Sequence, residues 1–250
     1  MDKPIVHGKY KIIKVLSSDW QYEASVCLNV TQKNDYATSV VNIYRDKQAI
    51  KEFLPLYFGM TPDTCRDFEE IICSDRVVSV VFAYHNGEDA AKFFGTHRFE
   101  TYEEQLEYAE MLLCKALELD IVDDRIAACV LKQGVVLDPT SRKIHFNYII
   151  TPDVPVEDGF RSQGLGVLMQ KIFKPNRYLP AEIEDFCQNM AAGGFGSCVE
   201  IYSTWKSIQE DAERTRKLYL KESFFKYLLR RSKRKREQAK RNKRRTDERE

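Results

Sequence analysis

The N-terminal third of the chain alternates apolar and polar residues with the two-residue period of β-strands. Three such runs follow Gly8, separated by the polar segments SSDWQ and TQKND; they are YKIIKVL, YEASVCLNV and YATSVVNIY. KQAIKEFLPLYF then has its apolar residues at helical spacing, although Pro55 shortens or kinks that helix. Two further strand-like runs, DFEEIICSD and RVVSVVFAYH, lead to the turn Asn86-Gly87. The pattern therefore predicts five antiparallel strands and one short helix within residues 1–87.

Beyond that turn the apolar residues recur mostly at helical spacing. Thr101 and Glu104 form a capping-box pattern that opens the helix YEEQLEYAEMLLCKALELDI. The runs ACVLKQGVVLD and KIHFNYII flank the turn DPTS and predict a β-hairpin. We then predict helices over LGVLMQKIFK, over PAEIEDFCQNMAAG, and over one long segment that begins at SCVEIYSTW and continues into a basic tail. The expected domains are an N-terminal lobe (1–87), a helical lobe (88–229) and a basic tail (230–250).

The composition is typical of a folded protein that is not exported. The chain has 250 residues, 43% of them hydrophobic, which is enough for one cored domain or two small lobes. It has no run of about 18 apolar residues, and its N-terminus, MDKPIVHGKY, is too charged for a signal peptide. The seven cysteines lack Cys-x-x-Cys spacing, and the four histidines lack partners at metal-ligand spacing. We expect a cytoplasmic protein with reduced cysteines and no metal site.

The charge is distributed unevenly along the chain. The formal net charge is +1, but residues 230–245 carry eleven basic side chains and one acidic one, which leaves about −9 on the remainder. Three interpretations of this tail stay open: an anionic membrane surface, nucleic acid bound through its phosphates, and a solvated tail without a partner. Nucleic acid is the less favoured partner because the basic run has almost no interleaved aromatic residues. The candidate binding residues are Arg230, Arg231, Lys233, Arg234, Lys235 and Arg236.

The order of these elements resembles that of a protein kinase over roughly residues 8–210. GKYKIIKVLSS is similar to the first strand of a kinase, VVFAYHNGEDAAKFF to the hinge between the two lobes, and GVVLD with KIHFNYI to the strands that flank the magnesium site. The resemblance implies an α+β, bilobal fold with a five-stranded antiparallel N-terminal lobe and a helical C-terminal lobe. That helical lobe is reduced, because only TPDVPVEDGFRSQG stands where an activation segment is required, and a basic C-terminal helix follows it.

On this alignment the positions that bind nucleotide in a kinase carry unsuitable residues. Ser17–Glu23, SSDWQYE, stands in place of the glycine-rich loop and has no glycine. Tyr44 stands in place of the lysine that contacts the phosphates, and a phenol supplies no positive charge. Glu52 is the candidate for the acidic helix residue that pairs with that lysine, although a solvated glutamate is the simpler interpretation.

The positions that carry the kinase reaction are also changed. Ala127-Ala128-Cys129 aligns with His-Arg-Asp, so that Cys129 stands at the catalytic base, and Gly134 stands at one metal ligand. Asn147 aligns with the aspartate of Asp-Phe-Gly, and an amide is a poorer ligand for Mg²⁺ than a carboxylate. We therefore expect no cofactor and no phosphoryl transfer.

Among kinase-like proteins the chain is most similar to bacterial pseudokinases, including the kinase-like subunit of Gram-positive type VII secretion systems. The resemblance implies a catalytically inactive pseudokinase that acts as a scaffold for a protein partner, at the cytoplasmic membrane face in that group. A transmembrane helix follows the pseudokinase there but is missing here. Two explanations stay open: this chain is a piece of a longer protein that ends before the membrane segment, as the abrupt finish at TDERE suggests, or it is a free pseudokinase with a basic end.

Two other functions stay open. The first is an atypical nucleotide-binding or phosphotransfer protein, which would use Asp123, Asp124 or Asp138 with a displaced lysine such as Lys14 or Lys47. The second is a nucleic-acid-associated protein that binds through its basic tail.

Overall fold

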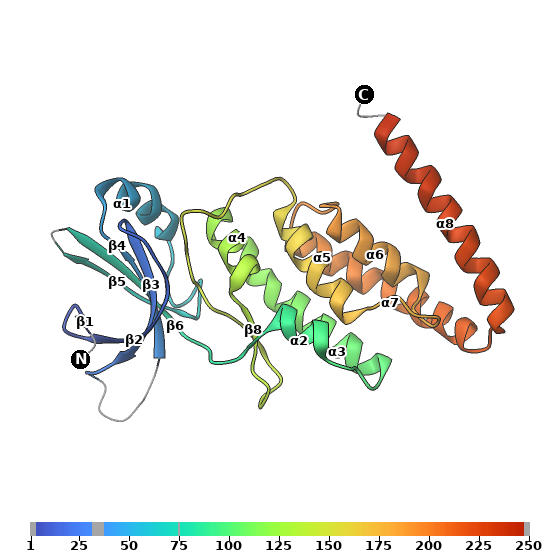
Figure 1. Ribbon diagram of the computed structural model, residues 1–250, viewed down its shortest axis with the longest axis horizontal. Coiled ribbons are helices and arrows are strands. Elements are labelled where there is room, and N and C mark those ends of the chain that lie inside the picture. Colours follow the sequence, from blue (N-terminus) through green and yellow to red (C-terminus); the bar gives the residue numbers. More distant parts are fainter. Residues whose placement is uncertain (1–3, 32–37, 75, 248–250) are drawn as a thin grey trace.

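The computed structural model describes residues 4–31, 38–74 and 76–247, with the backbone alone for residues 235 and 237–247. A curled β-sheet forms one end of the molecule, helices form the middle, and a last helix extends away from them (Figure 1). Within the described residues no helix is long and apolar enough to cross a lipid bilayer.

The sheet contains the five predicted strands and one short additional strand. Its order is β1-β2-β3-β4-β6-β5, and all neighbours are antiparallel. The two-residue β1 pairs with the edge of β2, and nothing in the alternating pattern indicated it. The strands are β1 (Ile5–Val6), β2 (Tyr10–Ser18), β3 (Tyr22–Asn29), β4 (Thr38–Tyr44), β5 (Phe68–Ser74) and β6 (Val77–Ala83).

Successive residues of β4 enter two different hydrophobic cores, as the two-residue period of a strand requires. Val41 and Ile43 pack in a small core with Tyr10, on one face of the curled sheet. Tyr44, on the other face, belongs to the main core, which continues into the helical lobe. Helix α1 (Lys47–Phe53) and the 3₁₀ turn η1 (Leu54–Tyr57) pack on that second face, and Pro55 lies at the start of η1, where the predicted helix was expected to be shortened.

The helical lobe includes a small second sheet of order β7-β8-β9, which contacts α2, α3 and α4. Thr101 caps α3 as predicted, because its hydroxyl oxygen accepts a hydrogen bond from the Glu104 amide at 3.0 Å. The elements are β7 (Glu88–Asp89), α2 (Ala90–Thr96), α3 (Tyr102–Ala116), η2 (Leu117–Asp120), α4 (Asp124–Gln133), β8 (Val135–Leu137), β9 (Ile144–Phe146), α5 (Phe160–Ile172), α6 (Ala181–Ala191), α7 (Cys198–Leu220) and α8 (Phe224–Asp247).

The prediction of a strand for the first arm of the hairpin is wrong over most of that arm. Residues 127–133 belong to α4, and only Val135–Leu137 form a strand. Asp123 caps the helix by accepting a hydrogen bond from the Arg125 amide at 2.9 Å. The helix is buried on several sides, so its apolar run is continuous, and a short continuous run does not distinguish a buried helix from a buried strand.

The long C-terminal helix predicted as one piece is also divided. α7 ends at Leu220, and α8 begins at Phe224 and extends in a different direction (Figure 1). The Arg177 side chain donates a hydrogen bond to the carbonyl oxygen of Glu222, within the connecting segment. A tertiary contact therefore stabilises the break, and the sequence around it contains no helix-breaking proline or glycine. The predicted domain boundaries remain predictions, and the second of them falls inside α8.

Candidate functional site

The candidate site is the region between the two lobes, beneath the turn that joins β2 to β3. That turn is stabilised by its own side chains: the Asp19 carboxylate accepts hydrogen bonds from the amides of Gln21 and Tyr22, at 2.6 and 2.9 Å. Trp20 at its tip is 75% exposed, whereas the ring of Tyr22 is buried in the main core. The turn is therefore held by its own polar contacts, and its one buried ring, that of Tyr22, packs in the main core.

Tyr44, at the position expected for the phosphate-contacting lysine, is almost fully buried. Its ring stacks on Phe53 of α1, with the ring centroids 5.2 Å apart. Its hydroxyl group forms a 2.5 Å hydrogen bond with that of Tyr57. Burial raises the pKa of the Tyr44 phenol, which keeps it neutral. β4 and η1 are thus joined by two tyrosines at the position where a kinase would have an ion pair.

Asn42 precedes Tyr44 by two residues on the same face of β4 and links the lobes. Its side-chain nitrogen donates to the carbonyl oxygen of Tyr148 at 2.8 Å, and its oxygen accepts from the amide of Ile150 at 2.9 Å. The side chain is 1% exposed, so both hydrogen bonds are formed away from water. A polar residue inside the apolar run VVNIY was the sequence signal for such a contact, because buried polar groups require partners.

Asn147, at the position expected for the metal-binding aspartate, forms a second pair of hydrogen bonds between the lobes. Its side-chain oxygen accepts from the amide of His85 at 2.8 Å, and its nitrogen donates to the His85 carbonyl oxygen at 2.9 Å. His85 lies in the segment between β6 and β7 that connects the lobes. The Asn147 side chain, which is 2% exposed, therefore occupies both backbone hydrogen-bonding groups of one hinge residue.

Tyr148 fills the space next to these amides. Its ring is fully buried and stacks on Phe82 of β6, with centroids 4.7 Å apart and planes inclined by 13°. Burial raises the pKa of its phenol above the ordinary range. An aromatic pair with one ring from each lobe thus stands between β6 and the segment after β9.

Gly134, at the position expected for the other metal ligand, leaves no room for a side chain. A Cβ atom on this residue would lie 2.2 Å from the carbonyl oxygen of Asn147 and 3.1 Å from the Cα atom of Val130. The Gly134 carbonyl oxygen accepts a hydrogen bond from the Asn147 amide at 2.8 Å. The chain after β9 is therefore packed directly against the end of α4.

Cys129, at the position expected for the catalytic base, is buried inside α4. Its thiol contacts the carbonyl oxygen of Thr151 at 3.5 Å, and burial raises the pKa of the thiol. The alternative carboxylates also have structural contacts: Asp123 caps α4, Asp124 pairs with Arg161 at 2.7 Å, and Asp138 accepts from the Ser141 hydroxyl at 2.6 Å.

The three remaining charged candidates lie at the surface. Lys14 and Lys47 are exposed. Glu52 forms an ion pair of 2.5 Å with Arg125 of α4, and both side chains are close to half exposed. Glu52 is therefore paired across the lobes and not with Tyr44.

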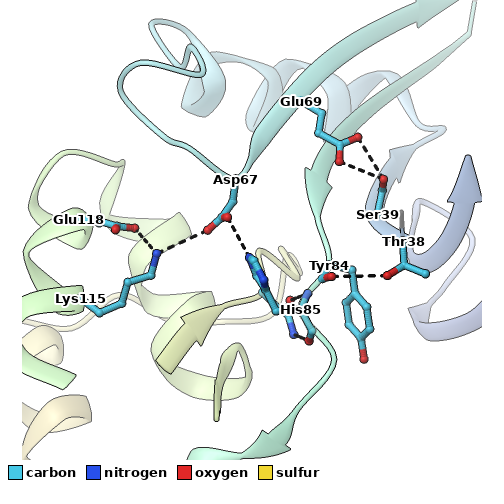
Figure 2. Close-up of polar contacts among 9 residues, drawn as sticks. Thr38, Ser39, Asp67, Glu69, Tyr84, His85, Lys115 and Glu118 are labelled. Carbon is cyan, nitrogen blue, oxygen red and sulfur yellow. Dashed lines mark hydrogen bonds and ion pairs between the residues drawn. The ribbon is translucent and has the colours of Figure 1, made fainter. Parts of the chain in front are cut away.

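A polar cluster behind the hinge was not anticipated from the sequence. The His85 ring contacts the Asp67 carboxylate at 2.9 Å, and Lys115 of α3 contacts the other Asp67 oxygen at 3.6 Å and Glu118 at 2.6 Å (Figure 2). The ring of His145 stacks on that of His85 at 4.1 Å. Four separate segments contribute to this cluster, so no local motif in the sequence could indicate it.

The surroundings shift two pKa values in this cluster. Burial by itself raises the pKa of Asp67, but the hydrogen bond from His85 and the charge of Lys115 outweigh it and lower that pKa. Burial, His85 and Lys115 together lower the pKa of His145. Within the described residues, no three His, Cys, Asp or Glu side chains are grouped so that they could hold a metal ion.

The predicted binding residues of the tail differ in their surroundings. Arg230 and Arg234 face the body: Arg230 pairs with Glu222 at 2.8 Å, and Arg234 pairs with Glu184 at 2.6 Å. Arg231, Lys233 and Arg236 are exposed. The side chain of Lys235 lies outside the described part of the structure.

A curled antiparallel sheet with one helix after its third long strand, a connecting hinge and a helical lobe define a protein-kinase-like fold. The solved kinase domain of Mycobacterium tuberculosis PknI superposes with a TM-score of 0.54 at 14% sequence identity, and the match covers 83% of this chain and 99% of that one. A double mutant of the same domain gives a TM-score of 0.52 at 15% identity, with 83% and 98% coverage. No family model and no curated protein matches the sequence.

Proposed function

We propose that this chain is a catalytically inactive pseudokinase whose space between the lobes is closed by its own side chains, and that it acts as a scaffold for a protein partner. The observation that carries the proposal is the pair of hydrogen bonds between the Asn147 side chain and the backbone of His85. A side-chain amide presents a donor group and an acceptor group side by side, as the edge of an adenine ring also does. A purine that approached the hinge would have to displace this side chain.

Three further features favour a closed site. Tyr148 and Phe82 stack where a flat ligand would need space. Asn42 holds the segment after β9 against β4. Tyr44 is neutral and uses its hydroxyl group on Tyr57, so no cation at this position would neutralise a triphosphate.

The finer resemblance belongs to the same proposal. A five-stranded N-terminal lobe, a reduced helical lobe and changed catalytic positions are similar to the bacterial pseudokinases of type VII secretion systems. A scaffold in the cytoplasm, at the membrane face, would need a stable arrangement of its two lobes and would need no catalytic activity. The contacts of Asn42 and Asn147 provide such an arrangement without a bound nucleotide.

Thermal denaturation with nucleotide tests the proposal, because a ligand that binds only the folded state must raise the melting temperature. We expect millimolar ATP, ADP or adenosine, with Mg²⁺ or Mn²⁺, to leave the melting temperature unchanged, and incubation with labelled ATP to transfer no phosphate.

A rise that depends on the divalent cation would contradict the proposal and favour the phosphotransfer alternative. Asp124→Asn and Asp138→Asn variants would then show which carboxylate is used. Both residues are near the surface in this structure, so either substitution should leave the fold intact.

A further inference from the structure

The N-terminal part of α8 combines an exposed apolar edge with exposed basic side chains. Phe224, Phe225, Leu228 and Leu229 are 61%, 71%, 44% and 59% exposed. These four residues follow α7 directly and precede the most basic stretch of the chain. An exposed patch of large hydrophobic side chains indicates an interaction surface.

The helical positions of these residues place the apolar edge and two basic residues on opposite sides of α8. Successive residues of an α-helix are rotated by about 100°, so Phe224, Phe225, Leu228 and Leu229 occupy one continuous side. Arg230 and Arg234 lie on the opposite side, where they pair with Glu222, Glu184 and Asp185. The body thus holds α8 through charged groups, and the apolar edge faces away from it.

Exposed cations border the apolar edge on both sides. At about 100° per residue, Arg231 flanks the edge on one side, and Lys226 and Lys233 flank it on the other. All three are exposed. Arg236 continues the line of the apolar edge about two turns further along the helix, and its side chain is exposed as well.

We propose that this edge of α8 inserts into the interface of an anionic lipid bilayer, with Phe225 and Leu229 among the acyl chains and Arg231, Lys233 and Arg236 on the headgroups. An apolar stripe bordered by basic residues is the pattern of a helix that lies in a membrane interface. Nucleic acid would contact the cations but leave the apolar edge in water. A second α8 would bring two strongly basic helices together, which like-charge repulsion opposes.

The structure also changes which tail residues are expected to contact the partner. Arg230 and Arg234 fix the orientation of α8 on the body and do not face the bilayer. Of the six candidates from the sequence, Arg231, Lys233 and Arg236 have exposed side chains suited to lipid headgroups. This inference does not depend on the closed site between the lobes.

Flotation of the full chain with lipid vesicles tests the inference. We expect binding to vesicles of phosphatidylcholine mixed with phosphatidylglycerol, and weak binding to phosphatidylcholine alone. Phe225→Glu with Leu229→Glu should weaken binding by at least about tenfold, because charged groups would enter the acyl region. Arg231→Glu with Lys233→Glu should weaken it to a similar degree and make the remainder insensitive to salt.

Matched controls lie on other faces of the molecule. Phe58 and Ile121 are 71% and 65% exposed, so Phe58→Glu with Ile121→Glu makes the same chemical change away from α8. Lys14→Glu with Lys47→Glu reproduces the change in net charge at exposed residues of the N-terminal lobe. Both controls should bind vesicles as the unmodified protein does.

Three outcomes would overturn the inference. They are the absence of flotation with anionic vesicles, equal weakening by the control variants, and unchanged flotation of the Phe225 and Leu229 variant. Loss through the charge variant alone, together with binding of RNA that Phe225→Glu leaves unchanged, would identify nucleic acid as the partner of the tail. Circular dichroism melting of each variant establishes that the fold is retained.

Discussion

At the scale of single residues, two buried asparagines are the most informative side chains in the molecule. Asn42 and Asn147 each use both the donor and the acceptor of their amide on backbone groups of the other lobe. Both side chains are buried, so removing either amide leaves backbone groups in a buried or partly buried place without their partners. These residues therefore hold the lobes together more strongly than exposed ion pairs such as Glu52 with Arg125.

Asn147→Ala should lower the free energy of unfolding by about 2 to 4 kcal/mol, because the amide and carbonyl groups of His85 lose their partners. Urea denaturation followed by tryptophan fluorescence measures this change. Asn86→Ala, at the neighbouring and exposed hinge residue, is the control and should change stability by less than about 0.5 kcal/mol. Equal effects of the two substitutions would show that the Asn147 contacts do not stabilise the protein.

Sequence patterns identified several residues of the site but not their contacts. The alignment placed Tyr44, Gly134 and Asn147 at positions near the space between the lobes, and the structure brings their segments together there. The partner of Asn147 is His85, 62 positions away in the chain, which no local pattern indicates. The cluster of Asp67, His85 and Lys115 was missed for the same reason.

At the scale of elements, the described contacts that hold α8 on the body are made mainly by the guanidinium groups of Arg230 and Arg234. Arg234 pairs with Glu184 and Asp185 and donates to the carbonyl oxygen of Ala181. The flanking apolar residues are exposed and contribute little to docking. We therefore expect α8 to separate from the body more easily than any helix of the main core.

Arg230→Ala with Arg234→Ala should release α8 while the remainder of the protein stays folded. The melting temperature should change little, because partly exposed ion pairs contribute about 1 kcal/mol or less. Hydrogen exchange of residues 224–236 should accelerate, and Lys226→Ala, at an exposed position of the same helix, should leave it unchanged. Acceleration throughout α6 and α7 would mean instead that α8 supports the helical lobe.

At the scale of the whole molecule, the cluster of Asp67, His85, Lys115 and His145 links the protonation of His145 to the stability of the folded protein. His145 stacks on His85, and the charged groups that act on it are those of His85, Lys115, Asp67 and Asp138. Its pKa lies below the ordinary value of 6.5 in the folded state. The unfolded chain therefore binds this proton more readily, and the stability associated with neutral His145 is lost as the pH falls below about 6.5.

Melting temperatures recorded from about pH 7.5 to 5 should consequently fall towards acid. His145→Gln should reduce the slope of that fall, because glutamine does not titrate. Asp67, whose pKa is lowered from 3.8, contributes only at more acidic pH. His97→Gln, which removes a histidine outside the cluster, is the control and should retain the slope of the unmodified protein. A slope unchanged by His145→Gln would contradict the link.

The sequence by itself determined most strands and helices, because the period of apolar residues follows directly from the geometry of a strand or a helix. It also determined the α+β class and, through the order of elements, the protein-kinase-like fold. Tertiary structure decided the rest. α4 is a helix because its apolar run is surrounded by core, and the chain breaks before α8 where Arg177 binds Glu222. The hydrogen bonds between the lobes join residues far apart in the chain, and their energies depend on burial that only the folded protein provides.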